Sequence, residues 1–447
     1  MTMMQAIGGE VTAPVERAPA ASWYALAVLV LTTLFAFVDR QIINLIAPSL
    51  QATLHFSDLQ IGALQGLGMA LFASVASYPF GWLADRFGRR LLLCIGVAIW
   101  SLSTAVCAFQ NGFAGLFAAT IGIAIGEAGL APIIFAMIPD LFPERQRNTA
   151  NFIYFAAALL GAAAGIALGG LTLRWLAASQ SSLPPFLAAL APWRVALLMV
   201  AAPGPVFVVL VAMIRGGKPP VRAIASPALH EQDGTRLTPF ARAHWKTLAC
   251  LLGTVGAYSF PLMSSFTWLP IAVPRIFHTP SAETGIQMGM AMAGGTIIGL
   301  LLPAIGTKFV ARHSAVQPLR LARLFMMLAI VPTGWFLVAS APWQLYLAAA
   351  AQLAFALAVA AMMPGILQQI APAPLRARIL ALLGIVGALG TGLCPLIVGA
   401  VSGLIAGQRG ILAAIVIVGM PGWLLAIVLL SLARRPFLAT LEAVRQL

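Results

Sequence analysis

A short charged loop between two long apolar stretches decides how this chain is organised. The loop reads Gly81-Trp82-Leu83-Ala84-Asp85-Arg86-Phe87-Gly88-Arg89-Arg90, and the apolar stretches on either side run near 59–83 and 91–108. Each stretch is long enough to cross about 30 Å of hydrocarbon as an α-helix. The loop therefore predicts a helical hairpin in a membrane, with an arginine-rich turn that faces the cytoplasm.

The same pattern extends along all 447 residues, of which 61% are hydrophobic and 9% charged, with a mean hydropathy of +0.97. This composition leaves too little polar surface to cover a soluble globule of this size. We therefore predict an all-α membrane protein with twelve transmembrane helices in two six-helix bundles. The twelve apolar stretches run near 23–48, 59–83, 91–108, 113–136, 149–173, 193–214, 246–270, 284–306, 321–340, 343–366, 379–404 and 411–433.

The distribution of charge predicts the orientation. With both termini in the cytoplasm, all but five of the 26 Lys and Arg residues fall on that side, as the positive-inside rule expects. The net charge of +14 therefore does not indicate a nucleic-acid partner. Residues 1–22 hold no apolar core followed by a cleavage site, so the first span is expected to act as the insertion signal. The expected location is a bacterial inner membrane. The five exceptions are Arg40, Arg174, Arg194, Arg275 and Arg409.

A long polar interruption near 215–245 divides the spans six and six. An internal repeat supports the division, because Pro143-Glu144-Arg145-Gln146-Arg147 follows the fourth span and Pro374-Leu375-Arg376-Ala377-Arg378 follows the tenth. Such repeats are typical of transporters in which two bundles alternate access around a central site. The expected organisation is a cytoplasmic tail (1–22), a first bundle (23–214), a cytoplasmic linker (215–245), a second bundle (246–433) and a cytoplasmic tail (434–447).

The charged loop at 81–90 resembles the G-x-L-A-D-R-x-G-R-R loop of the major facilitator superfamily. The resemblance implies a cytoplasmic gate that joins the two halves when the transporter faces outward. Its counterpart in the second half, 306–313, has no acidic residue, so the gate is expected to be asymmetric. The residues that the resemblance assigns to this gate are Gly81, Asp85, Arg86, Gly88, Arg89, Arg90, Asp140, Glu144 and Arg145.

Four further motifs resemble the spinster-like branch of that superfamily. They are Phe37-Val38-Asp39-Arg40-Gln41, Ile61-Gly62-Ala63-Leu64-Gln65-Gly66, Trp100-Ser101-Leu102-Ser103-Thr104 and Gly122-Ile123-Ala124-Ile125-Gly126-Glu127-Ala128. Organic-anion/proton symporters carry a similar set. Both groups usually have an Arg two turns before the Glu, where this chain has Thr120. The departure removes a cation that would hold Glu127 ionised or bind an anionic substrate.

Three charged residues lie deep inside the apolar stretches: Asp39, Arg40 and Glu127. Charge at membrane depth is costly and indicates a functional site. One guanidinium cannot neutralise two carboxylates, so binding a single proton would make the cluster neutral. We expect Arg40 to pair mainly with Asp39 or to bridge both, which leaves Glu127 to exchange the proton because burial disfavours its charge. The alternative is a static ion triad between the first and fourth spans.

Polar and aromatic residues near this cluster are candidates for the lining of a substrate cavity. The amides of Gln41, Asn44 and Gln65 are each more often an interhelical hydrogen bond than a ligand contact. Trp268 is equally typical of an aromatic residue at the membrane interface. The candidates are Gln41, Asn44, Gln65 and Thr120 in the first half and Tyr258, Ser264, Ser265, Phe266 and Trp268 around Pro261 in the seventh span.

These features predict a proton-coupled secondary active transporter of a small organic or amphiphilic, lysolipid-like substrate, working by alternating access. An organic-acid/proton symporter is the alternative. A drug exporter is less favoured, because Ile166 stands where the antiporter motif of the fifth span has Pro. No cofactor, metal or enzymatic activity is predicted. The expected partners are protons, the lipid bilayer and a small-molecule or lipid-like substrate, and the expected state is a monomer.

Overall fold

The computed structural model describes residues 18–214, 237–309, 316–372 and 375–446, and within these ranges the chain is helical and contains no strand. Most of the predicted first tail and linker, and Pro374 of the second repeat, lie outside the described residues. Eleven of the described helical stretches are long and apolar enough to cross a membrane. The ninth predicted span (321–340) is not among these eleven; it corresponds to α14 (Gln317–Trp335), whose first turns carry Arg320 and Arg323. The predicted helical fold is confirmed.

The N-terminal bundle contains six spans, three of which are built from consecutive helical segments. A short element follows the fifth span, comprising η2 (Gln180–Ser182) and α8 (Pro185–Ala188). The six spans are, in order, α1 (Ala20–Leu54); α2 (Asp58–Ala63), η1 (Leu64–Leu71) and α3 (Phe72–Phe87); α4 (Arg89–Cys107); α5 (Phe113–Ala128) and α6 (Leu130–Leu141); α7 (Glu144–Ala178); and α9 (Pro192–Ala201) with α10 (Gly204–Ala212).

The C-terminal bundle contains the other six spans and two short helices that were predicted as linker and tail. The first, α11 (Leu237–Ala243), buries Phe240, and the second, α18 (Arg434–Arg445), buries Phe437 and Leu441. These apolar anchors explain why the two segments fold onto the bundle instead of remaining extended. The spans are α12 (Trp245–Phe277), α13 (Ser281–Phe309), α14, α15 (Pro342–Ile370), α16 (Arg376–Leu404) and α17 (Gly410–Leu432).

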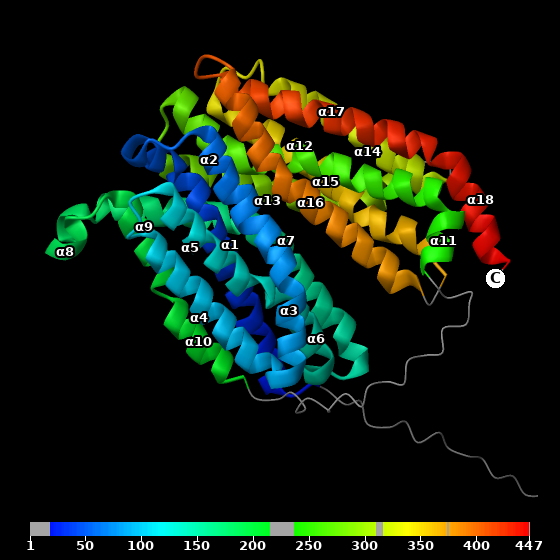
Figure 1. The fold of residues 1–447 in the computed structure, drawn as a ribbon, viewed down its shortest axis with the longest axis horizontal. Helices are drawn as coiled ribbons and strands as arrows, with labels where there is room; N and C mark the ends of the chain where they lie inside the picture. The colour runs from blue at the N-terminus through cyan, green and yellow to red at the C-terminus, as the bar shows by residue number, and fades with distance from the viewer. Residues whose placement is uncertain (1–17, 215–236, 310–315, 373–374, 447) are drawn as a thin grey trace, which may run out of the picture.

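The two bundles meet at one end of the molecule and diverge at the other (Figure 1). We call the end where α10 finishes and α11 begins the linker end, and the opposite end, where α2 begins, the distal end. Towards the distal end α2 and η1 pack on α16, while α7 packs on α13 along the interface. The continuation α3 packs on helices of its own bundle. The space between the bundles therefore opens towards the linker end.

Glycines allow the helices of the two bundles to approach closely. A Cβ added to Gly62 would meet the carbonyl oxygen of Pro395 on α16, and one added to Gly170 of α7 would lie 2.6 Å from the carbonyl oxygen of Ala282 on α13. Neither position has room for a side chain. Gly170 of the fifth span therefore permits close packing at the α7–α13 contact.

Candidate functional site

A cavity of about 470 Å³ lies between the two bundles. Helices α1, η1, α3 and α7 form its N-terminal wall, and α12, α13, α15 and α16 form its C-terminal wall. The N-terminal wall consists of Phe37, Arg40, Gln41, Asn44, Gln65, Met69, Ala73, Ser74, Ala158, Leu159, Ala162 and Ala163. The C-terminal wall consists of Leu262, Met263, Phe266, Thr267, Thr296, Leu353, Leu357 and Thr391.

Arg40 is the one charged side chain among the described residues that line this cavity. Its guanidinium binds Glu127 of α5, with Nη2 at 2.5 Å and Nε at 3.1 Å from the same carboxylate oxygen, Oε2. The Arg40 side chain is 41% exposed and that of Glu127 is 2% exposed. Arg40 therefore lies between the cavity and Glu127, the buried acid with which it forms an ion pair.

The neighbouring acid, Asp39, points away from Arg40 into the N-terminal bundle. Thr104 of α4 holds it, with its hydroxyl 2.8 and 2.7 Å from the two carboxylate oxygens, and Asp39 is 1% exposed. Among the described residues, no ion pair links Arg40 to Asp39. The expected pairing was therefore wrong: Arg40 binds Glu127, and Asp39 is the carboxylate without a dedicated cation. The reason is helical geometry, since consecutive residues on a helix point about 100° apart.

Small residues bring these charges together. Gly126 allows α5 to pack against α4, because a Cβ at this position would lie 2.6 Å from the backbone nitrogen of Trp100. Gly165 of α7 similarly faces the carbonyl oxygen of Phe37, where a Cβ would lie 2.6 Å away. Close packing at these two glycines joins α5 to α4, whose Thr104 bonds Asp39, and joins α7 to α1. The Arg40–Glu127 ion pair then links α1 to α5.

Four of the nine predicted cavity residues line the cavity: Gln41, Asn44, Gln65 and Phe266. Gln41 Oε1 accepts a hydrogen bond of 2.8 Å from Asn44 Nδ2. Asn44 Oδ1, Gln65 Nε2 and Glu127 Oε1 are buried and have no hydrogen-bond partner among the described residues. Gln65 belongs to η1, which is π-helical, and such departures from α-helical geometry are frequent at functional sites. The unpaired atoms of Asn44 and Gln65, two residues that line the cavity, can bind a ligand.

The other five predicted residues are buried elsewhere, so their assignment to the cavity was wrong. Thr120 donates to the carbonyl of Leu116, and a Cβ on Gly68 would touch its methyl group. Tyr258 and Ser264 are buried within the C-terminal bundle. Ser265 bonds Gln352, which in turn donates to Thr333. Trp268 is fully buried beside Gly399 of α16, so it is not an interface aromatic either.

The apolar C-terminal wall was not predicted. Leu262, Met263, Leu353 and Leu357 are ordinary residues of apolar spans, and no sequence signal separates those facing a cavity from those facing lipid. Phe37, by contrast, stands next to the charge cluster in a motif that was recognised, so its position in the wall could have been inferred.

At the linker end, the charged loop 81–90 makes its described contacts within the N-terminal bundle. Arg89 forms ion pairs with Asp140, at 2.5 Å, and with Asp85, at 3.6 Å. Arg86 lies over the rings of Trp82 and Phe87, with its guanidinium carbon 5.6 and 5.7 Å from their centroids. Gly88 has φ of 103°, which explains why glycine is needed at this turn. This arrangement is expected of an open linker end, and the gate in the other state stays a prediction.

Three comparisons place the chain among known proteins. The family model "Major Facilitator Superfamily" matches residues 29–393. "Protein spinster homolog 1" of Xenopus laevis is 26% identical over 304 residues, which cover 65% of this chain and 55% of that protein. The "Probable L-galactonate transporter" of Escherichia coli is 24% identical over 301 residues, covering 64% and 62%. The chain thus matches less than two thirds of the length of either relative.

The fold is also similar to that of a solved spinster homologue. A crystal structure of a bacterial homologue of the human lysosomal transporter spinster, in an inward-facing and unoccupied conformation, superimposes with a TM-score of 0.71 at 21% identity. The superposition covers 95% of this chain and 98% of that one. Together with the family match, it shows that this multi-pass membrane protein belongs to the Major Facilitator Superfamily.

Proposed function

We propose that the chain is a proton-coupled secondary active transporter that moves an organic anion by alternating access between its two bundles. The observation that carries this proposal is the position of Arg40. Its guanidinium faces the cavity and at the same time neutralises Glu127, which is buried behind it. One cation therefore serves two possible anions: the carboxylate of the protein and that of a ligand.

Competition for Arg40 provides the coupling. When an anionic ligand binds the guanidinium, Glu127 loses the one cation that pairs with it in the described part of the chain, and a buried carboxylate without a partner is strongly disfavoured. Uptake of a proton by Glu127 removes that cost. Among the described residues Asp39 is bonded by the Thr104 hydroxyl alone, so a second carboxylate is ready to hold a proton while Arg40 stays on Glu127. Anion and proton would then occupy the site together.

The two walls support an amphiphilic substrate with a single anionic group. Charge and amide groups occur only on the N-terminal wall, among the described lining residues. The C-terminal wall offers mainly apolar side chains, and two of its three threonines, Thr296 and Thr391, donate to carbonyls of their own helices. An anionic head against Arg40 and a hydrocarbon tail against α12 and α15 would satisfy both walls. A lysolipid-like molecule has this shape.

A small hydrophilic organic acid is the second candidate. The matched "Probable L-galactonate transporter" supports it, and Arg40 would bind its carboxylate equally well. The further proposals are a bacterial inner-membrane location with both termini in the cytoplasm and a monomeric state. They follow from the placement of Lys and Arg in the loops and from a cavity that one chain completes.

Purified protein in liposomes that contain a pH-sensitive dye would test the proposal. Addition of a lysophosphatidic acid, a lysophosphatidylcholine or galactonate should show which ligand drives proton movement, and the anionic amphiphile is expected to do so. Arg40→Gln should weaken binding of the active anion about 10- to 150-fold, because a hydrogen bond to a charged group contributes roughly 1.5–3 kcal/mol.

Arg174→Gln is the matched control, since Arg174 is an exposed arginine of α7 that does not line the cavity. If galactonate alone moved protons, the organic-acid symporter would replace the amphiphile transporter. If the Arg40 and Arg174 variants bound the active anion equally well, the anion site would have to lie elsewhere.

A further inference from the structure

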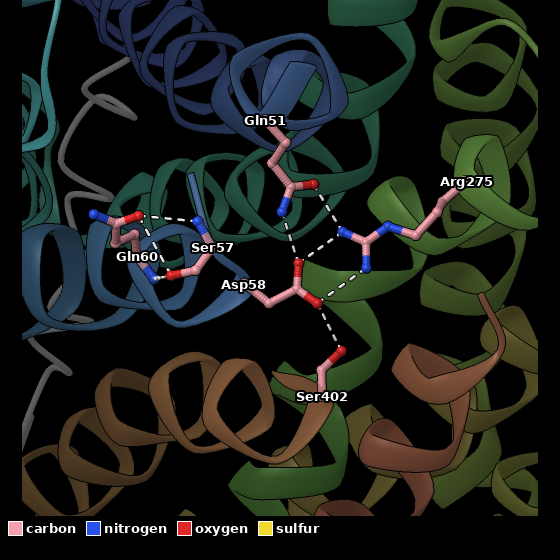
Figure 2. Close-up of polar contacts among 6 residues, drawn as sticks. All are labelled: Gln51, Ser57, Asp58, Gln60, Arg275 and Ser402. Atoms are coloured by element: carbon pink, nitrogen blue, oxygen red, sulfur yellow. Dashed lines mark hydrogen bonds and ion pairs between the residues drawn. The ribbon is translucent and has the colours of Figure 1, made fainter. Parts of the chain in front are cut away.

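A second cluster of charged and polar groups joins the bundles at the distal end, and none of its residues belongs to a motif named in the sequence analysis. It consists of Gln51 of α1, Asp58 of α2, Arg275 of α12 and Ser402 of α16, and we call it the distal clamp. Figure 2 shows the four side chains converging from these helices on the Asp58 carboxylate. Two residues come from each bundle.

The clamp is held by five hydrogen bonds, four of which cross between the bundles. Arg275 binds Asp58 through two bonds, of 3.0 and 2.7 Å, and donates a third, of 2.7 Å, to Gln51. Ser402 donates to Asp58 at 2.7 Å, and Gln51 completes the cluster with a bond of 2.7 Å to the same carboxylate. The bidentate geometry is the strongest that an arginine and a carboxylate can form.

Local structure fixes Asp58 in this position. Helix α1 ends at His55, which has φ of 54°, and α2 begins at a capping box in which Ser57 accepts from the backbone of Gln60 at 3.2 Å while Gln60 accepts from the backbone of Ser57 at 2.9 Å (Figure 2). Asp58 is thus the first residue of α2, where the helix dipole favours a carboxylate. On the other side, α12 ends at His278 with φ of 53°, one turn after Arg275.

Burial makes the clamp stronger than an ordinary surface ion pair. The Asp58 and Arg275 side chains are 12% and 26% exposed, and Gly399 brings α16 against the backbone of Asp58. Water can therefore replace few of these bonds while the bundles stay together. Separation of α1 and α2 from α12 and α16 would break the four crossing bonds, three to Asp58 and one to Gln51, and expose all four side chains to solvent.

We propose that the distal clamp is a gate, and that Asp58 and Arg275 are positioning residues whose separation is a required step in each transport cycle. The cavity opens towards the linker end while the clamp is closed. Access from the distal side requires α2 to move away from α12, so the clamp sets the balance between the two states. This inference rests on alternating access, which the proposed function includes, but on neither the proton coupling nor the substrate.

Distances between spin labels on the full-length protein in nanodiscs would test the gate, at one pH and without substrate. Leu59→Cys on α2 and Leu404→Cys on α16 are exposed distal positions on opposite bundles, and Leu91→Cys with Leu432→Cys reports the linker end. Cys94 and Cys250, which are partly exposed, are replaced by serine in every sample. Asp58→Asn and Arg275→Gln should each lengthen the distal distance, shorten the linker-end distance and raise the distal-open population roughly 10-fold or more.

The double variant Asp58→Asn/Arg275→Gln should shift the population about as far as either single variant, because both remove the same interaction. Arg409→Gln is the matched control: it removes an exposed distal arginine that takes no part in the clamp, and it should leave both distances unchanged. If a charge variant does not fold, Ser402→Ala removes one crossing bond and should give a smaller shift in the same direction. Unchanged distances in every clamp variant that folds, or an equal shift in Arg409→Gln, would overturn the gate.

Proton flux and clamp opening can fail separately. A protein that shifts its distances as expected but moves no protons would retain the gate and lose the proposed coupling. If the wild-type protein moves protons as expected but the clamp variants keep wild-type distances, the proposed coupling would stand and the gate would be lost.

Discussion

The two walls of the central cavity differ in chemistry although they come from halves with the same helical plan. The N-terminal wall carries Arg40, Gln41, Asn44 and Gln65, and two of its amide atoms have no partner in the part of the chain that the structure describes. The C-terminal wall holds no charged or amide group among its described residues, and its polar side chains hydrogen-bond largely within the bundle. Under the proposed function, this difference implies a division of labour: the first half would recognise charge and couple it to protons, and the second half would select the shape of the apolar part.

The largest effect is expected from Glu127→Gln, which tests whether the N-terminal wall is the coupling wall. The amide cannot exchange a proton, so ligand-driven proton uptake into liposomes should fall to the background rate. Binding of the anion should persist or become tighter, because Arg40 loses its charged competitor. Both can be measured on one preparation, by dye fluorescence and by a binding titration.

Glu283→Gln provides the comparison for this variant. Glu283 is a carboxylate at the start of α13 that accepts a hydrogen bond of 2.8 Å from Gln287 of the same helix and does not line the cavity. The Glu283→Gln variant should show ligand-driven proton uptake at the wild-type rate. Wild-type proton uptake by Glu127→Gln would remove Glu127 from the coupling step and leave the Arg40–Glu127 pair as a structural contact.

An intermediate effect is expected from Leu353→Phe, which enlarges the C-terminal wall. The larger side chain fills part of the cavity, so ligands with long hydrocarbon tails should bind roughly 10-fold more weakly, while a small organic acid should be little affected. Leu347→Phe makes the same change six residues earlier on α15, at a position that is 63% exposed. A loss of binding that did not depend on tail length would contradict the division between the walls.

The smallest effect is expected from Gln65→Leu. The Gln65 amide is buried without a partner, so its replacement should stabilise the empty protein by about 1 kcal/mol and weaken ligand binding a few-fold. Thermal unfolding with and without ligand would measure both. Gln41→Leu should behave in the opposite way in the empty protein, because Gln41 accepts a bond from Asn44 that would be lost. Destabilisation by Gln65→Leu would mean that its amide has a structural partner.

The sequence predicted the helical architecture and the place where its charges meet, because both leave local signals. Apolar stretches define the spans, and Asp39, Arg40 and Glu127 stand out as charges inside them. The pairing could not be predicted in the same way. Asp39 and Arg40 are neighbours in sequence but project to different helices, so the guanidinium reaches Glu127 while Asp39 turns to Thr104.

The distal clamp shows the same limit at longer range. Asp58 and Arg275 are 217 residues apart, and each resembles an ordinary charge at the end of a span. Only the packing of α2 against α12 and α16 makes them partners. Asp85 had the stronger sequence signal, yet its side chain is 72% exposed in this state and its described ion pair reaches only Arg89, four residues along the chain across the Gly88 turn.

The volume of the cavity also has a consequence for water. At about 30 Å³ per molecule in the liquid, 470 Å³ corresponds to about 15 waters. If the transporter changes its open side while the cavity is empty, the waters in the cavity would move from one side of the membrane to the other. A cavity filled by an amphiphile would hold few of these waters. Each productive cycle would therefore transfer a small, fixed volume of solvent against the direction of the substrate, and osmotic pressure across the bilayer would influence the rate of the empty return.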